Sequence, residues 1–97
     1  MPFTIRLGPT YYNQGILNPG VDASRFLGKD GDPIRIRFSE GAEPVISKIN
    51  RTANSSGAVR VVGENSRIAR WFQANFREGD TVEGRVVDPH TIELLAR

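Results

Sequence analysis

The sequence contains no cysteine, one histidine, one methionine and one tryptophan among its 97 residues. Without cysteine the chain forms no disulfide and no thiolate metal site. Because there is only one histidine, any metal site would have to be built from oxygen ligands. No apolar run approaches the ~20 residues that a membrane-spanning helix needs. Residues 1–4 lack the charged and apolar regions of a signal peptide, so we expect a cytoplasmic protein with no membrane partner.

Groups suited to catalysis are equally scarce. His90 occurs in a proline-containing turn, and the sequence spacing places no nucleophile or orienting carboxylate beside it. Residues 28–31 lack the length and the Ser or Thr of a phosphate-binding loop. A nuclease cluster would need an acid two positions before Lys48, where the chain has Ile46. We therefore predict no enzymatic activity, no cofactor and no metal site.

A pattern of short helix, Gly-Asp turn and alternating strand occurs twice in the chain. The first copy covers residues 22–27, 31–32 and 34–38, and the second covers residues 66–72, 79–80 and 82–86. Residues 34–38 alternate apolar with charged side chains, which is typical of a strand with one buried face. Such a pseudo-repeat indicates a small closed or half-closed β-barrel with two helices at its ends.

The remaining apolar segments complete this barrel. Strands are predicted at residues 3–7, 45–49, 58–62, 81–87 and 91–95. Apolar side chains spaced three and four residues apart form one stripe of the second helix, and we expect it to be core: Ile68, Trp71, Phe72 and Phe76. The total is six to seven strands and two short helices, with no linker, in one domain of residues 1–97.

Residues 44–60 contain no acidic residue and carry Lys48, Arg51 and Arg60. Within them, residues 50–57 have no apolar side chain larger than alanine, so this loop projects into solvent or onto a partner. Asn and Arg match the major-groove edges of adenine and guanine, and Ser and Thr bind phosphate oxygens. A second polar cluster at residues 10–14 offers amides for bases and a phenol for phosphate. Two such segments on one basic domain favour a nucleic-acid partner.

The order of these features resembles the DNA-binding pseudobarrel fold. It is similar to the recognition domains of EcoRII- and BfiI-type restriction endonucleases, and more distantly to the DNA-binding domains of plant auxin-response-type transcription factors. The resemblance covers nearly the whole chain and is carried by residues 11–16, 26–27, 48–51, 60–62, 70–75 and 79–80. It implies a mainly β (α+β) fold, a single small pseudobarrel of six to seven strands with two short helices.

In that family two arms grip the major groove of double-stranded DNA. By position, the resemblance implies a first arm of Tyr11, Tyr12, Asn13 and Gln14. It implies a second arm of Lys48, Asn50, Arg51, Asn54 and Ser55, with Arg60 behind it. The chain has no nuclease domain of its own, so we expect either a standalone binder or a domain whose effector or nuclease partner lies elsewhere.

The leading hypothesis is thus a non-catalytic module for sequence-specific DNA recognition, of the kind found in restriction–modification proteins. One alternative is a swapped-hairpin DNA-binding dimer, as in antitoxins and transition-state regulators, because Gly-Asp turns also lead into alternating strands there. Another alternative is a protein- or ligand-binding adaptor, which the small net charge of +2 favours. In an adaptor, Arg35, Arg37 and Arg85 would form cross-strand ion pairs with Glu83 and Glu93.

Overall fold

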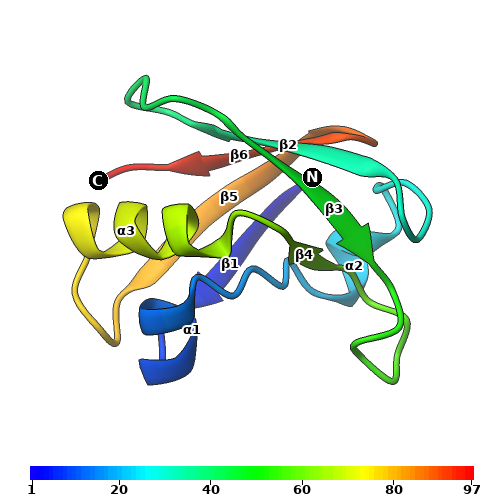
Figure 1. Cartoon of the computed structure of the whole chain (residues 1–97), viewed down its shortest axis with the longest axis horizontal. Coiled ribbons are helices and arrows are strands. Elements are labelled where there is room, and N and C mark those ends of the chain that lie inside the picture. The colour runs from blue at the N-terminus through cyan, green and yellow to red at the C-terminus, as the bar shows by residue number, and fades with distance from the viewer.

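A six-stranded mixed sheet, curled into a half-barrel, forms most of the fold (Figure 1). The computed structural model describes all of residues 1–97. In chain order the strands are β1 (Pro2–Arg6), β2 (Pro33–Phe38), β3 (Val45–Asn50), β4 (Arg60–Val62), β5 (Thr81–Asp88) and β6 (Thr91–Leu95). Their order across the sheet is β1-β5-β6-β2-β3-β4, and every neighbouring pair is antiparallel except β2–β6. The predicted α+β barrel and its strand count are confirmed.

The two Gly-Asp turns of the pseudo-repeat have the same internal hydrogen bonds. Gly31 and Gly79 have φ angles of 87° and 92°, a region that glycine adopts without steric cost. The Asp32 carboxylate accepts a hydrogen bond from the backbone N–H of Lys29 at 2.9 Å, and Asp80 accepts one from Arg77 at 2.8 Å. Each turn therefore ends in an aspartate that closes it just before β2 or β5 begins.

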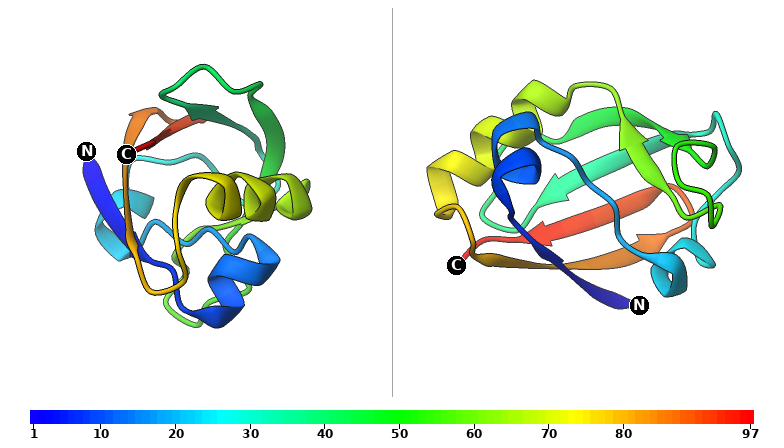
Figure 2. Two further views of the ribbon diagram at one scale, coloured as in Figure 1. Left: turned by 90° about the vertical axis from the view of Figure 1, so that its left-hand side faces the viewer. Right: turned by 90° about the horizontal axis from the view of Figure 1, so that it is seen from below.

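Three helices accompany the sheet: α1 (Pro9–Gln14), α2 (Val21–Ser24) and α3 (Asn65–Asn75). The second and third match the two predicted helices, whereas α1 was not expected to be helical. Four residues of α3 are buried against the sheet, and the Trp71 ring stacks on Phe38 with centroids 4.7 Å apart. Figure 2 (left) shows the sheet curling around α3, so the stripe predicted as core does fill the half-barrel. None of these helices has the length and apolar character needed to cross a bilayer.

The two edges of the sheet, β1 and β4, are connected by helices and by one extended segment. The backbone N–H of Val61 in β4 donates to the carbonyl of Leu17 at 3.0 Å, which adds residue 17 to this edge as an isolated bridge. One chain thus supplies all six strands, and the half-barrel needs no strand from a second chain. The fold therefore differs from the swapped-hairpin alternative, in which two chains together complete one barrel.

Candidate nucleic-acid interface

The first predicted arm is the helix α1, and its two tyrosines face inward. Pro9 occupies the first turn, where its missing N–H costs no hydrogen bond, and Gly15 ends the helix with φ 69°. Tyr12 is half-buried and donates through its hydroxyl to the carbonyl of Phe76 at 3.0 Å. The amide of Gln73 in α3 donates to the carbonyl of Tyr12 at 3.2 Å. The aromatic side of this arm therefore positions the helix on α3.

The outward side of α1 carries the two amide side chains of the predicted arm. Asn13 and Gln14 are both exposed, and neither side chain makes a hydrogen bond within the protein. Their donors and acceptors are thus available to a partner. Of the four predicted residues in this arm, the structure places two at the surface and two against the core.

Asn18, which no motif in the sequence singles out, links the two arms. Its side-chain nitrogen donates to the Tyr11 hydroxyl at 2.7 Å. Its side-chain oxygen accepts from Nε of Arg60 at 3.3 Å and, at the 3.5 Å limit, from the Asn54 amide. We call these four residues the polar junction: Tyr11, Asn18, Asn54 and Arg60. It brings together α1, the segment after it, the β3–β4 loop and β4.

The β3–β4 loop, residues 51–59, keeps its shape through its own side chains. The Asn50 side-chain oxygen accepts hydrogen bonds from the backbone N–H groups of Thr52 and Ala53 at 2.8 and 2.9 Å. The Asn54 amide also donates to the carbonyl of Ala58 at 3.2 Å. Ser55 is exposed at the tip of the loop. The loop is therefore preformed, and its exposed polar groups are held outward.

Arg51 fastens this loop to the end of α2. Its guanidinium donates to the carbonyls of four residues at 2.8–3.2 Å: Ser24, Leu27, Gly28 and Gly57. Its backbone N–H donates to the Asp30 carboxylate at 2.8 Å. Because arginine has five N–H donors, little of this side chain remains to contact a base. Its predicted contact with DNA stays a prediction, and its contacts here position the loop.

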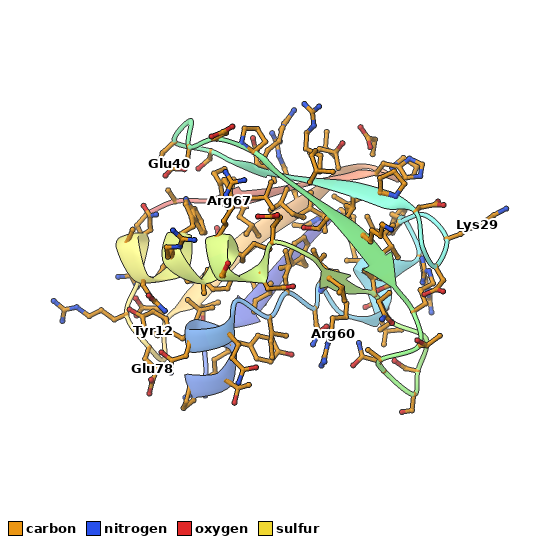
Figure 3. All side chains as sticks on the ribbon, in the orientation of Figure 1. Tyr12, Lys29, Glu40, Arg60, Arg67 and Glu78 are labelled. Atoms are coloured by element: carbon orange, nitrogen blue, oxygen red, sulfur yellow. The ribbon has the colours of Figure 1, made fainter.

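These segments form one continuous face of the molecule. Figure 2 (right) looks onto that face: the segment after α1 runs from α1 across to α2, and the β3–β4 loop lies on the same side of the view as α2. Figure 3 shows the Arg60 side chain pointing out between the α1 region and the loop. Arg60 donates internally only through Nε, so both of its terminal nitrogens are available. Lys48 is exposed on the outer face of β3, opposite Val62 of β4, and is outside the junction.

A second cation borders this face at the end of α2. Arg25 is exposed and lines a hollow of about 290 Å³ together with Arg51, Ser56 and Gly57. No acidic residue lines the hollow. Arg25 and Arg60 therefore both place positive charge beside the β3–β4 loop.

On the opposite side of the sheet, several arginines are paired with acids. Glu93 of β6 contacts Arg37 at 3.2 Å and Arg85 at 2.8 Å. The ion pairs expected for an adaptor are thus present for these two arginines, while Arg35 and Glu83 form none. The Glu93 side chain is only 15% exposed while both arginines are partly in solvent, so these are half-buried ion pairs and not surface ones.

The single histidine lies with two carboxylates in adjoining turns. The pKa of Asp32 is below its ordinary value of 3.8, chiefly because its carboxylate accepts the backbone N–H of Lys29, and next because His90 Nε2 lies 3.1 Å away. The pKa of Asp88 is lowered chiefly by the backbone N–H of His90, at 2.8 Å. These contacts keep both carboxylates ionised and order the turns. No group of three metal-ligating side chains occurs in residues 1–97.

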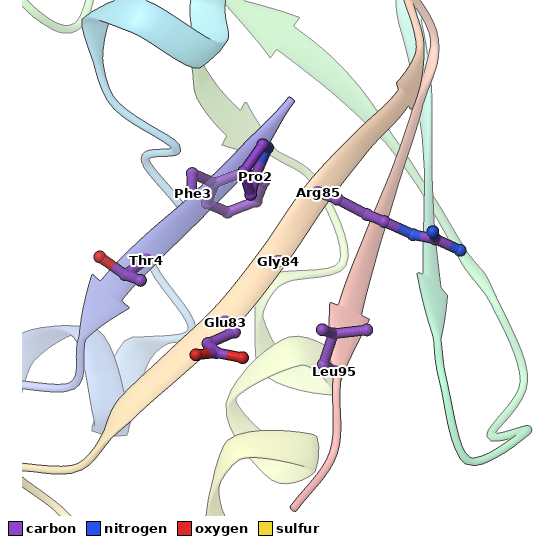
Figure 4. Close-up of a pocket in the computed structure, with 7 residues that line it drawn as sticks. All are labelled: Pro2, Phe3, Thr4, Glu83, Gly84, Arg85 and Leu95. Carbon is purple, nitrogen blue, oxygen red and sulfur yellow. The ribbon is translucent and has the colours of Figure 1, made fainter.

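The largest hollow of the surface lies elsewhere, across β1, β5 and β6 (Figure 4). It measures about 490 Å³, and Gly84 lies at its centre with Thr4, Glu83, Arg85 and Leu95 around it. Its one cation, Arg85, already contacts Glu93. The hollow is separate from the polar junction and brings together no set of reactive groups.

Comparisons with known proteins identify the fold. No family model and no curated protein matches this sequence. The structure of the hypothetical Arabidopsis thaliana protein At1g16640.1 matches with a TM-score of 0.65 and 9% identity, over 100% of this chain and 89% of that one. The N-terminal domain of Helicobacter pylori LlaJI.R1 matches with a TM-score of 0.68 and 8% identity, over 97% and 78%. Arabidopsis FUS3, solved as a complex with DNA, matches with a TM-score of 0.64 and 19% identity, over 98% and 94%.

These matches confirm the DNA-binding pseudobarrel fold that the sequence resemblance implied. They cover the whole of the half-barrel, including the segments that form the polar junction. At identities of 8–19%, the likeness concerns the fold.

Proposed function

We propose that this chain binds double-stranded DNA through the face built around the polar junction. The observation that carries the proposal is the convergence of three side chains from both predicted arms on Asn18, in a domain whose fold is shared with FUS3, a protein solved with DNA. The face offers outward amides on α1, two available arginines and a preformed loop. Those are the groups that bind base edges and phosphates.

The proposed role of each side chain depends on whether its hydrogen-bonding groups are free or already bonded within the protein. Arg60 presents two terminal nitrogens, which suits a bidentate contact with a phosphate or a guanine edge. Asn13 and Gln14 supply base-edge contacts from α1, and Ser55 supplies a phosphate contact from the loop. Tyr11, Tyr12, Asn50, Asn54 and Arg51 hold these groups in place. Lys48 lies outside the proposed face, and its contact with DNA stays a prediction.

Sequence specificity is the finer part of the proposal. Amide and guanidinium groups on preformed elements distinguish bases only if they enter a groove together, and the junction fixes α1 and the loop relative to each other. We propose a specificity module of the restriction–modification type, with any effector or nuclease activity on another domain or chain. A set of duplexes selected from a random pool would provide the cognate site.

Fluorescence anisotropy with labelled duplexes tests the proposal. We expect Arg60→Gln to weaken binding of the selected duplex by about 1–3 kcal/mol and to relax preference at one base position. Arg85→Gln is the matched control, because Arg85 is an exposed arginine on β5 outside this face. Trp71, buried in the core, reports whether each variant is folded.

Three outcomes would count against the proposal. No binding of any duplex at ~50 mM salt, where phosphate contacts are strongest, would favour the adaptor instead. Equal losses for the two variants would show that binding does not use this face. An equal loss on every duplex would leave DNA binding but remove base recognition by Arg60.

A further inference from the structure

The outer surface of β3 and β4 carries an exposed apolar patch that the DNA face does not use. Ile46, at 57% exposure, and Val62, at 41%, are among the most exposed large apolar side chains of the molecule. They line one hollow of about 400 Å³, together with Pro33, Lys48 and Glu64. None of these residues belongs to the polar junction.

Strand register places four of these side chains at the corners of a square. Ile46 and Lys48 are two residues apart on β3 and both exposed, so they share its outer face. Lys48 is opposite Val62. The Ser47 hydroxyl donates to the carbonyl of Gly63 at 2.7 Å, so the two segments stay together one residue beyond β4 and bring Glu64 beside Ile46. We call this group the β3–β4 square: Ile46, Lys48, Val62 and Glu64.

The square has its apolar side chains on one diagonal and its opposite charges on the other. Lys48 forms no ion pair within the chain, and the one cation near Glu64 is Arg67, at the long distance of 3.9 Å. A twofold axis along the apolar diagonal would place Ile46 on Ile46 and Val62 on Val62 of a second copy. The same rotation places each Lys48 opposite the other Glu64. The surface is therefore complementary to itself, as a twofold interface requires.

We propose that the β3–β4 square is a homodimer interface of this chain. Charge complementarity favours a second copy over a nucleic acid, because Glu64 would repel a phosphate backbone. The small apolar area is typical of a weak dimer, so we expect assembly in the micromolar range of concentration. The polar junction of each copy remains outside the interface, and dimerisation is measured without DNA. The proposal can therefore fail or hold independently of the proposed function.

Charge exchange at the square provides the test, by sedimentation velocity over ~1–500 μM protein. We expect the wild type to dimerise, and Lys48→Glu or Glu64→Lys to weaken the dimer at least about tenfold, because like charges then meet twice. The double variant Lys48→Glu/Glu64→Lys restores opposite pairs and should return to within about threefold of the wild type. Lys29→Glu is the matched control, an exposed lysine of the β2 turn outside the square.

Ile46→Asp should abolish the dimer without unfolding the chain, because the Ile46 side chain is mostly in solvent. A thermal melt monitored by Trp71 fluorescence verifies that this variant is folded. A wild type that stays monomeric throughout would overturn the proposal. A dimer equally weakened by Lys48→Glu and Lys29→Glu would also overturn it, because the effect would then be one of net charge. So would a double variant that fails to recover.

Discussion

The side chain of Arg51 holds two segments of the chain together through hydrogen bonds to main-chain oxygens. Its four carbonyl acceptors belong to the end of α2 and to the β3–β4 loop. Arg51→Ala should lower the free energy of unfolding by about 2–3 kcal/mol, because bonds to a charged donor are lost and partly buried carbonyls lose their partner. Urea denaturation monitored by Trp71 fluorescence measures the change.

The control for Arg51 is Arg35→Ala, an exposed arginine of β2 without an ion pair, for which we expect a change within about 0.5 kcal/mol. Arg51→Lys should behave like alanine, since one ammonium cannot reach four carbonyls spread around a planar fork. If Arg51→Ala kept full stability but lost DNA binding, the base contact implied by the sequence would be favoured over the positioning role.

Single residues also show where sequence reasoning stops. Arg60 and Asn54 were recognised because an acid-free run of polar residues is visible in the sequence. Asn18 was missed, because its partners Asn54 and Arg60 lie 36 and 42 positions away and the link exists only after folding. The sequence could predict which side chain types were exposed. It could not predict that the Arg51 guanidinium would donate its hydrogen bonds to four backbone carbonyls.

Among the elements, the strands were predictable and α1 was not. The period of two in β1, β2 and β5 follows directly from one buried face, so the sequence contains it. Six residues with two adjacent tyrosines show no helical period, and α1 owes its stability to packing on α3. The pseudo-repeat was visible because each Gly-Asp turn needs a positive φ and a side-chain acceptor. The joining of both arms by tertiary hydrogen bonds had no such local signal.

The contact between α1 and α3 depends on Gly15. A Cβ at this position would collide with the backbone oxygen of Asn65 and lie 2.6 Å from the Ala69 nitrogen, and the residue has φ 69°. We expect Gly15→Ala to destabilise the protein by about 2–4 kcal/mol, since both a left-handed backbone and a close helix approach are affected. It should also weaken DNA binding, because α1 carries Asn13 and Gln14. Thermal and urea unfolding measure the first effect.

Gly57→Ala separates the two causes. Gly57 also has a positive φ, 77°, but a Cβ there would meet nothing within 4 Å. We therefore expect only the conformational part, about 1 kcal/mol. Equal losses in the two variants would show that helix packing at Gly15 is not what limits the substitution.

Charge is unevenly distributed along the chain and therefore over the molecule. Residues 1–21 and 44–63 contain four cations and no acid, while the rest of the chain contains nine cations and all eleven acids. The acid-free parts include α1, the β3–β4 loop and β4, which form most of the proposed DNA face, and the α2 region adds one cation, Arg25, and one acid, Asp22. The net charge of +2 is thus the sum of a positively charged part and a rest of the chain in which cations and acids nearly balance. This distribution reconciles a DNA partner with a charge that suggested an adaptor.

The number of available cations on that face predicts how DNA binding depends on salt. Arg60 and Arg25 are available, whereas Arg51 is engaged internally, so about two phosphate contacts are expected. The logarithm of the association constant should then fall by about 2 per tenfold rise in salt, measured by anisotropy between ~50 and ~200 mM. Removing one contact with Arg25→Gln should reduce that slope by about 1.

A slope near zero would exclude phosphate contacts altogether. A slope above about 5 would require cations outside this face, such as Arg70 in α3 and Arg77 just after it, and would enlarge the interface beyond the one proposed.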